Sequence, residues 1–319
     1  MTALRISCIS TLFHNPHAVL VTAWLAVPLA GGCTVATEPA PSAAPQLLEV
    51  ASHVPGDYDW DGLSDLMYQQ DDTAFLRGDL SRDGTSVPDP YGPVTSTNWH
   101  LAAAADLDGD GRPDFVFQNT VSHSLVSWTM RDFQMVGGAF VVPLTPEDPT
   151  DVLVCSADFN GDHQADLVFQ SSDSSRRTIT VWVMDPNNPA VRRETHVITS
   201  AIPGFSVNNF RVAGCGDFSG EGLADLVLRG PAGNVTIAYI ENYQAFEQHR
   251  IPNPTRDWTW SLGAVGDLTG DGHFELVWQN TNTLAVEAWR MNYSDYTGTM
   301  LLTPPSPLPP HPWRLVGPK

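Results

Sequence analysis

The sequence predicts an all-β fold, a β-propeller of about five four-stranded blades. A nine-residue acidic loop recurs five times, beginning at residues 57, 106, 158, 217 and 267, at intervals of 49, 52, 59 and 50 residues. Short strand-like runs fill each interval, and no stretch of useful length has helical periodicity. A repeat of about fifty residues with four strands has the size of a propeller blade.

Each repeat contains its strand-like runs in the same order. An apolar run precedes the loop (Trp99–Ala104), and a β-rich run follows it (Phe115–Gln118). A third run carries tryptophan two residues before methionine (Trp128 and Met130), and a fourth is hydrophobic (Ala139–Val142). We expect the tryptophans and methionines to pack between blades rather than to form a ligand site.

A glutamine recurs at the end of the second run. We expect it to satisfy backbone groups at the strand end rather than to bind a ligand. The four positions are Gln69, Gln118, Gln170 and Gln279.

The end of the chain indicates how the ring closes. The run Pro312–Gly317 repeats the strand that precedes each loop, yet no sixth loop follows it. We expect this strand to complete the first blade and remove its exposed edge. The interval length favours five blades between Leu47 and Lys319, and a six-bladed ring with one degenerate unit is the alternative.

The loop that begins at Asp106 has the composition of a cation-binding turn. Its first, third, fifth and ninth residues are aspartates, and its sixth is glycine. Carboxylates on alternate residues of a tight turn converge, and glycine allows the turn to adopt positive φ. Ca²⁺ takes about six to eight oxygen ligands, and such a loop supplies most of them. The alternative is a hairpin turn whose aspartates cap backbone amides without metal.

The five loops differ in how completely they keep this pattern. The first, Asp57–Asp65, is as complete as the second, Asp106–Asp114. The third has His163 where glycine is expected. The fourth has the longer Glu221 at its fifth position, and the fifth closes with Glu275.

With the strands that follow them, the loops resemble the FG-GAP or VCBS repeat family, found in bacterial surface proteins and in the integrin α-chain propeller. The resemblance covers about Val50 to Gly317. It implies a propeller in which each loop joins the first two strands of a blade and binds Ca²⁺. The implied ligands are Asp57, Asp59, Asp61, Asp65, Asp106, Asp108, Asp110, Asp114, Asp158, Asn160, Asp162, Asp166, Asp217, Ser219, Glu221, Asp225, Asp267, Thr269, Asp271 and Glu275. We expect bound Ca²⁺ to act structurally.

The N-terminal segment resembles a bacterial lipoprotein signal. An apolar run from Ala18 to Ala30 is too short to span a bilayer as a helix and suits a signal peptide. It leads to Cys33, the residue that a lipobox would lipidate, although Ala30 stands where leucine is usual. The predicted domains are a signal peptide (1–32), a Pro/Ala-rich disordered tether (33–46) and the propeller (47–319). Simple secretion after cleavage is the alternative.

Two cysteines fall within the predicted propeller, Cys155 and Cys215, three and two residues before their loops. Because these offsets differ by one, equivalent strands would direct the two side chains to opposite faces. We therefore expect buried free thiols in preference to a disulfide.

The charge balance and the motifs restrict the classes of function that the sequence allows. The chain has 16 basic and 36 acidic residues, a net charge of −20, and no basic stripe, which argues against nucleic acid as a partner. No catalytic motif is apparent. We expect a non-enzymatic, monomeric interaction or adhesion module on the cell envelope, attached to the membrane only through Cys33 and binding an unknown protein or glycan. A lectin with pockets between blades is the alternative, and an enzyme acting in the central cleft is the third possibility.

Overall fold

The structure is a computed structural model. It describes residues 54–70, 76–79, 96–131, 134–252, 257–302 and 313–318. The chain divides into two compact units, Met1–Glu49 and Val50–Lys319, and every described residue belongs to the second. The predicted signal peptide, tether and Cys33 lie outside the described residues. Among those residues, no helix has the length and apolar character needed to cross a membrane.

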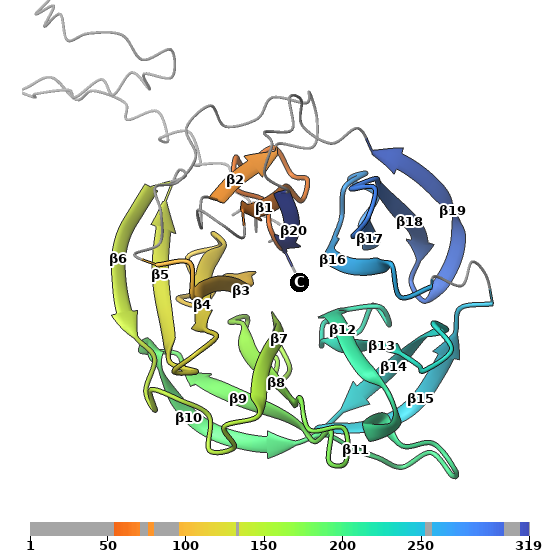
Figure 1. Cartoon of the computed structure of the whole chain (residues 1–319), viewed down its shortest axis with the longest axis horizontal. Coiled ribbons are helices and arrows are strands. Elements are labelled where there is room, and N and C mark those ends of the chain that lie inside the picture. The colour runs from red at the N-terminus through yellow and green to blue at the C-terminus, as the bar shows by residue number, and fades with distance from the viewer. Residues whose placement is uncertain are drawn as a thin grey trace, which may run out of the picture. The chain divides into compact units, whose positions relative to one another are not determined.

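The described chain forms five antiparallel sheets around a central axis, as Figure 1 shows. Their strands, from the axis outward, are β20 (Trp313–Gly317), β1 (Leu66–Gln70) and β2 (Leu76–Asp79) in blade 1; β3 (Trp99–Ala105), β4 (Asp114–Asn119), β5 (Leu125–Arg131) and β6 (Gln134–Phe140) in blade 2; β7 (Asp151–Ala157), β8 (Asp166–Ser171), β9 (Ile179–Asp185) and β10 (Asn188–Val197) in blade 3; β12 (Arg211–Gly216), β13 (Asp225–Arg229), β14 (Val235–Glu241), β15 (Gln244–Arg250) and β11 (Thr199–Ser200) in blade 4; and β16 (Trp260–Gly266), β17 (Glu275–Asn280), β18 (Val286–Asn292) and β19 (Asp295–Leu302) in blade 5.

The ring has five blades and closes as the sequence predicts. The innermost strands β20, β3, β7, β12 and β16 each pack against the next around the axis, and β16 packs against β20. Strand β20 pairs antiparallel with β1, so the last strand of the chain completes the first blade. The six-bladed alternative is therefore wrong. Closure leaves no exposed edge at the centre of blade 1.

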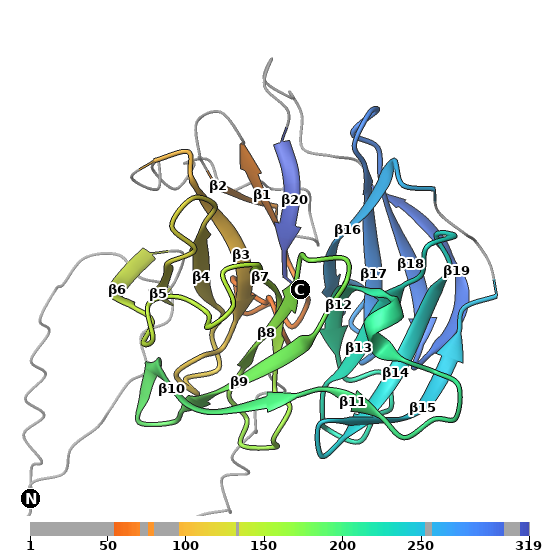
Figure 2. The same cartoon turned by 60° about the horizontal axis from the view of Figure 1, so that its bottom comes forward.

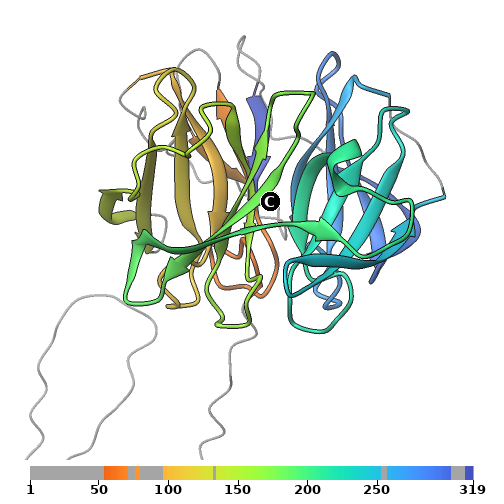
Figure 3. The same ribbon diagram turned by 90° about the horizontal axis from the view of Figure 1, so that it is seen from below.

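The turns between strands are local, but one outer connection spans two blades. After β10, the chain continues into β11, which pairs in parallel with β15 of blade 4. Figures 2 and 3 show this stretch crossing from blade 3 to blade 4. A short 3₁₀ helix, Val207–Asn209, follows before β12 begins.

The outer strand of blade 2 differs from the prediction. Of the expected run Ala139–Val142, only Ala139 and Phe140 belong to a strand, β6, which begins at Gln134 and ends at Phe140. Val142 instead forms a parallel bridge with Val191 of β10. It leaves its own sheet because its N–H donates to the Ala190 carbonyl and its carbonyl accepts from the Arg192 N–H.

The tryptophan and methionine repeats lie in the core, as predicted. Trp182, Trp278 and Trp289 are at most 1% exposed, and Met184 and Met291 are also buried. One apolar cluster combines residues of blades 2 and 3, including Trp182, so these side chains join adjacent blades. Burial of each large apolar side chain stabilises the fold by about 1.5–3 kcal/mol.

The recurring glutamines tie each blade to the next, which confirms their predicted backbone role. In each case Nε2 donates to a carbonyl of the neighbouring blade and Oε1 accepts the N–H two residues further on, at 2.9–3.2 Å. Gln279 bonds in this way to Trp313 and Leu315, and so holds the closing strand. In blade 4, Arg229 replaces glutamine and donates to the carbonyls of Trp260 and Asp257.

Cys155 and Cys215 form a disulfide, so the expectation of free thiols is wrong. By strand register Cys155 pairs with Val168, and Gly214 pairs with the equivalent Val227, so Cys215 lies one residue beyond the counterpart of Cys155. The two side chains do belong to opposite blade faces. In a propeller, however, one face of each blade packs against the opposite face of the next. The one-residue offset therefore brings the two sulfur atoms together between β7 and β12.

Candidate functional site

The five acidic loops occupy the same place in every blade. Four of them connect the innermost strand to the second strand, as between β3 and β4. The first loop precedes β1, and its innermost strand is β20 from the end of the chain. This is the placement that the resemblance implies.

The first residue of each loop organises the turn. Asp106 accepts the Gly109 N–H through Oδ1 and the Gly111 N–H through Oδ2, at 2.7 and 2.8 Å. The same two bonds recur at the other four loops, at 2.6–2.9 Å. These contacts are the amide capping that the metal-free alternative describes, and they fix the loops whether or not a cation is bound.

The departure at His163 leaves the turn unchanged. Gly111 adopts φ of 86° at the sixth position of the second loop, and His163 adopts φ of 67° at the same position of the third. The N–H of His163 donates to Asp158 Oδ2 at 2.7 Å, as that of Gly111 does to Asp106. A histidine here bears some backbone strain, because side chains with a Cβ disfavour positive φ.

The ninth residue closes each loop from inside the blade. Asp114 is 1% exposed; its Oδ2 accepts the Leu107 N–H and its Oδ1 the Met130 N–H. Asp166 and Asp225 repeat both contacts with their own loops and third strands. Asp65 accepts the corresponding N–H of Tyr58.

The buried carboxyl groups that close the second to fifth loops resist ionisation. Burial raises the pKa of Asp114 to about 7, and the negative charges of Asp108 and Asp106 add to the rise, while two backbone N–H groups oppose it. Burial likewise raises the pKa of Asp166, Asp225 and Glu275 to about 7, with further contributions from carboxylates of the same loops. Closely spaced, desolvated carboxylates are the environment that a divalent cation relieves.

The structure brings the predicted ligands together most clearly in the first two loops. Oxygen atoms of Asp57, Asp59 and Asp61 lie within 4.8 Å of one another, and so do those of Asp106, Asp108 and Asp114.

In the second loop, Asp110 Oδ2 instead pairs with the Arg131 guanidinium at 3.2 Å. Sequence reasoning missed this partner, because Arg131 lies on β5 and approaches the loop only once the blade is folded.

The third and fourth loops satisfy part of their own polar groups. Asn160 Nδ2 donates to Asp162 Oδ2 at 3.0 Å, and the Ser219 hydroxyl donates to Asp217 Oδ1 at 3.2 Å. In every loop except the fourth, the backbone N–H of the seventh residue donates to the aspartate at the fifth position. Glu221 makes no such bond within the described structure.

The fifth loop contains two oxygen atoms that the protein leaves unpaired. Glu275 is fully buried, and its Oε2 accepts the Leu268 N–H at 2.8 Å. Its Oε1 has no hydrogen-bond partner, and neither does the buried Thr269 Oγ1. Both residues are predicted ligands. Because unpaired buried oxygens cost about 1–3 kcal/mol each, they fit a loop completed by a cation.

The loops are hydrogen-bonded to one another around the ring. The N–H of the eighth loop residue donates to the carbonyl of the first residue in the preceding loop: Ala165 to Asp106, Ala224 to Asp158, and Ser64 to Asp267, at 2.7–2.8 Å. Pro113 holds the eighth position of the second loop and has no N–H to donate. The third and fourth loops are thus linked to the second, and the first to the fifth.

No family model matches the chain, and no curated protein matches it either. The fold defines it as a five-bladed β-propeller with a repeated acidic loop in every blade. The resemblance to FG-GAP or VCBS repeats stays a prediction that rests on the loop sequences.

Proposed function

We propose that this chain is a non-enzymatic, calcium-binding β-propeller that is exported to the cell envelope and serves there as an interaction or adhesion module. The observation that supports the calcium assignment is the fivefold recurrence of an oxygen-rich loop, whose carboxylate oxygens converge in the first two copies. In the fifth copy, Glu275 Oε1 and Thr269 Oγ1 have no hydrogen-bond partner in the protein. Carboxylate, hydroxyl and carbonyl oxygens are the donors that Ca²⁺ prefers over softer metals.

The residues that would hold the ions are the twenty predicted ligands, with the first two loops the most complete. Bound Ca²⁺ would supply positive charge to carboxylates that burial and mutual repulsion now disfavour as anions. This chain's own contribution is to hold the turn in advance: the first aspartate of each loop fixes the backbone through two N–H bonds. The proposed role of the metal is structural, because each loop joins the two innermost strands of a blade.

Export is supported by the disulfide. Cys155 and Cys215 are covalently joined between blades 3 and 4. Structural disulfides persist mainly in oxidising compartments outside the cytosol. The apolar N-terminal run and Cys33 supply a route to that location, with lipidation at Cys33 as the proposed anchor. Replacing Cys33 by alanine should move the protein from the membrane fraction to the soluble fraction, and unchanged membrane association would contradict the anchor.

The interaction role rests on the fold class and the absence of catalytic motifs from the sequence. Of the repeated tryptophans, Trp182 and Trp289 are buried between blades and Trp128 is half-buried. The aromatic rings exposed in the described residues are those of Trp60, Phe140, Phe246, Trp258 and Tyr293. No observation favours the lectin or enzyme alternatives over the interaction module.

A calcium titration of the melting temperature tests the metal assignment. The midpoint of the purified protein should rise with Ca²⁺ and respond weakly to Mg²⁺, because ligand binding stabilises the folded state by mass action. Replacing Asp108 by alanine should reduce the calcium-dependent part of the rise. Asp173 caps an exposed turn outside the loops and is the matched control: its replacement by alanine should lower the midpoint equally with Ca²⁺ and with chelator. A midpoint that ignores Ca²⁺ would leave the loops as capped turns.

A further inference from the structure

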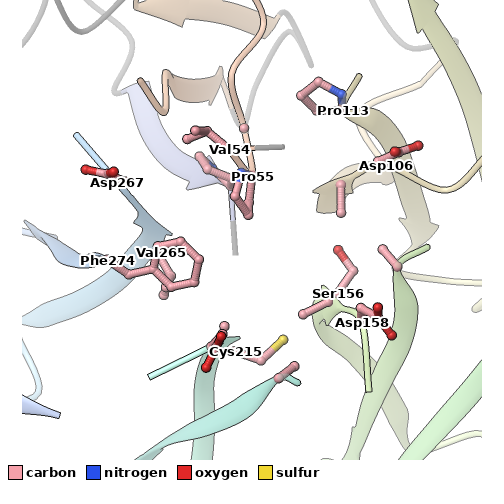
Figure 4. A pocket seen from close by; sticks show the side chains of 18 of the residues that line it. Val54, Pro55, Asp106, Pro113, Ser156, Asp158, Cys215, Val265, Asp267 and Phe274 are labelled. Carbon is pink, nitrogen blue, oxygen red and sulfur yellow. The ribbon is translucent and has the colours of Figure 1, made fainter. Parts of the chain in front are cut away.

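A cavity of about 490 Å³ lies at the centre of the propeller, where the innermost strands meet the acidic loops. Figure 4 shows its lining side chains, which come from all five blades. Six of the residues that line it are exposed, among them His163, Gly222 and Gly270, so the cavity reaches the protein surface. Small-molecule sites typically have volumes of about 300–1,000 Å³.

The wall is built from one position that repeats in every blade. The residue two places before each loop pairs with the residue directly after the loop, as Ala104 does with Phe115. Pro318 takes the same place after the closing strand. The five residues are Ala104, Ser156, Cys215, Val265 and Pro318, and all of them line the cavity.

This ring is apolar except at one point. Ala104, Val265 and Pro318 present hydrocarbon, and Cys215 is tied into the disulfide. The ring of Phe274 lies beside Val265 at the wall (Figure 4). An apolar wall with an aromatic face accommodates alkyl groups, and an aromatic face also attracts a cation.

Ser156 is the single hydroxyl in the ring. It is 6% exposed, its Oγ has no hydrogen-bond partner, and Figure 4 shows the side chain directed into the space between the blades. Oε1 of Gln164, another lining residue, also lacks a partner. Buried polar atoms normally have partners, so two unpaired atoms at one cavity wall indicate a missing donor group.

The charge at the cavity is negative. Four first-position loop aspartates line it, and no lysine or arginine does; the four are Asp106, Asp158, Asp217 and Asp267. The five loops together hold 17 carboxylates, whereas five divalent ions would contribute ten positive charges. The net charge of the loops therefore stays negative with or without calcium. A cleft with low-dielectric walls concentrates such a field.

We propose that the central cavity binds a small organic cation: an ammonium group with an alkyl body and one hydrogen-bond donor. The acidic rim and the Phe274 ring attract the charge, the apolar ring contacts the alkyl groups, and Ser156 and Gln164 receive the donor. An anion would be repelled by the rim. A neutral sugar carries more hydroxyl groups than the two unpaired wall atoms can pair. The proposal does not depend on calcium occupancy of the loops.

Choline and its neutral carbon isostere 3,3-dimethyl-1-butanol form a matched pair of probes. Titration calorimetry of the full-length protein, at the Ca²⁺ concentration that gives the highest melting temperature, should detect choline binding at least about tenfold tighter than that of the neutral alcohol. Added salt should weaken choline binding because its charge contributes. Failure of choline to bind, or equal binding of the two probes, would overturn the proposal.

Substitutions at the cavity wall test whether choline binds there. Ser156→Ala places at this position the residue that blade 2 already has at Ala104, and should weaken choline binding about three- to tenfold. Phe274→Leu should weaken choline more than the neutral alcohol. Ser127→Ala removes another buried serine, whose hydroxyl bonds to the Ala139 carbonyl, and should leave binding unchanged. Binding unaffected by Ser156→Ala and by Phe274→Leu would place the ligand elsewhere. Glucose binding with no response to choline would replace the cation by a sugar.

The calcium titration and the choline titration test separate proposals. A melting temperature that ignores Ca²⁺ contradicts the proposed function alone. An absent choline isotherm in a protein that Ca²⁺ stabilises contradicts the cavity proposal alone.

Discussion

Gln279 hydrogen-bonds blade 5 to the closing strand β20, and its replacement by methionine tests how far this contact secures the ring. Its Nε2 donates to the Trp313 carbonyl and its Oε1 accepts the Leu315 N–H, both at 2.9 Å. Gln279 is 7% exposed, and Trp313 and Leu315 are each 6% exposed. Methionine fills a similar volume but pairs with neither backbone group, so a buried carbonyl and a buried N–H lose their partners.

The expected loss of stability follows from the Trp313 carbonyl and the Leu315 N–H, which lose their partners. An unsatisfied buried donor or acceptor costs about 1–3 kcal/mol, so the substitution should lower the free energy of unfolding by about 2–6 kcal/mol. For a unit of this size, such a loss lowers the melting temperature by about 5–15 °C. Differential scanning calorimetry measures the shift, and hydrogen exchange measures the release of β20.

Gln118 is the matched control for closure. It makes the same two bonds, to Asp151 and Leu153 of blade 3, but chain connections on both sides also hold that strand. Gln118→Met should lower the melting temperature to a similar extent without faster exchange in β1 and β20. If Gln279→Met melts within about 2 °C of the wild type, or if both variants exchange alike in β20, the glutamine contacts do not secure the ring.

Three further predictions concern the disulfide and the loops. Reducing agent should lower the melting temperature of the wild type but not of a Cys155→Ala/Cys215→Ala variant, whose free energy of unfolding should lie about 2–4 kcal/mol below that of the oxidised wild type. Alkylation of Cys155 and Cys215 in the untreated protein, read by peptide mass spectrometry, would contradict this. In chelator, stability should fall as pH rises from about 4 to about 7, because burial raises the pKa of Asp114 in the folded state from 3.8 to about 7. The calcium-induced rise in melting temperature should grow over the same pH range. A stability that does not change with pH in chelator would contradict the raised pKa. Ala165→Pro copies Pro113 and removes the N–H that bonds to Asp106, so it should lower the Hill coefficient of calcium binding; an unchanged coefficient would show that the loops bind independently.

Sequence periodicity was sufficient for the architecture because it reflects local chemistry. Alternating acidic residues with a glycine define a turn wherever they occur, and the runs around Trp99 and Phe115 are strands because of their own length and composition. The position of the extra strand at Pro312–Gly317 was also readable, since a repeat that lacks its loop has one natural partner, the incomplete first blade.

The same pattern identified the loop residues but not their partners. Asp106 and Asp114 were predicted as a pair in one loop, and the structure brings their oxygens together. The Arg131 contact with Asp110, by contrast, depends on a strand that follows the loop and folds back beside it. The unpaired Oε1 of Glu275 depends on where one added methylene places an oxygen within the blade.

The sequence by itself determined the repeat, the strand order within each blade and the composition of the acidic loops, because each follows from residues close together in the chain. It favoured five blades, and the structure excluded six. Only the tertiary structure decided which blade faces meet. The packing of neighbouring blades joins Cys155 to Cys215 and places five separate residues around the central cavity. At the junction of blades 4 and 5, it lets Arg229 make the contact that glutamine makes at the other junctions. Each of these features joins positions 28 to 60 residues apart, which become neighbours only when the blades pack against one another.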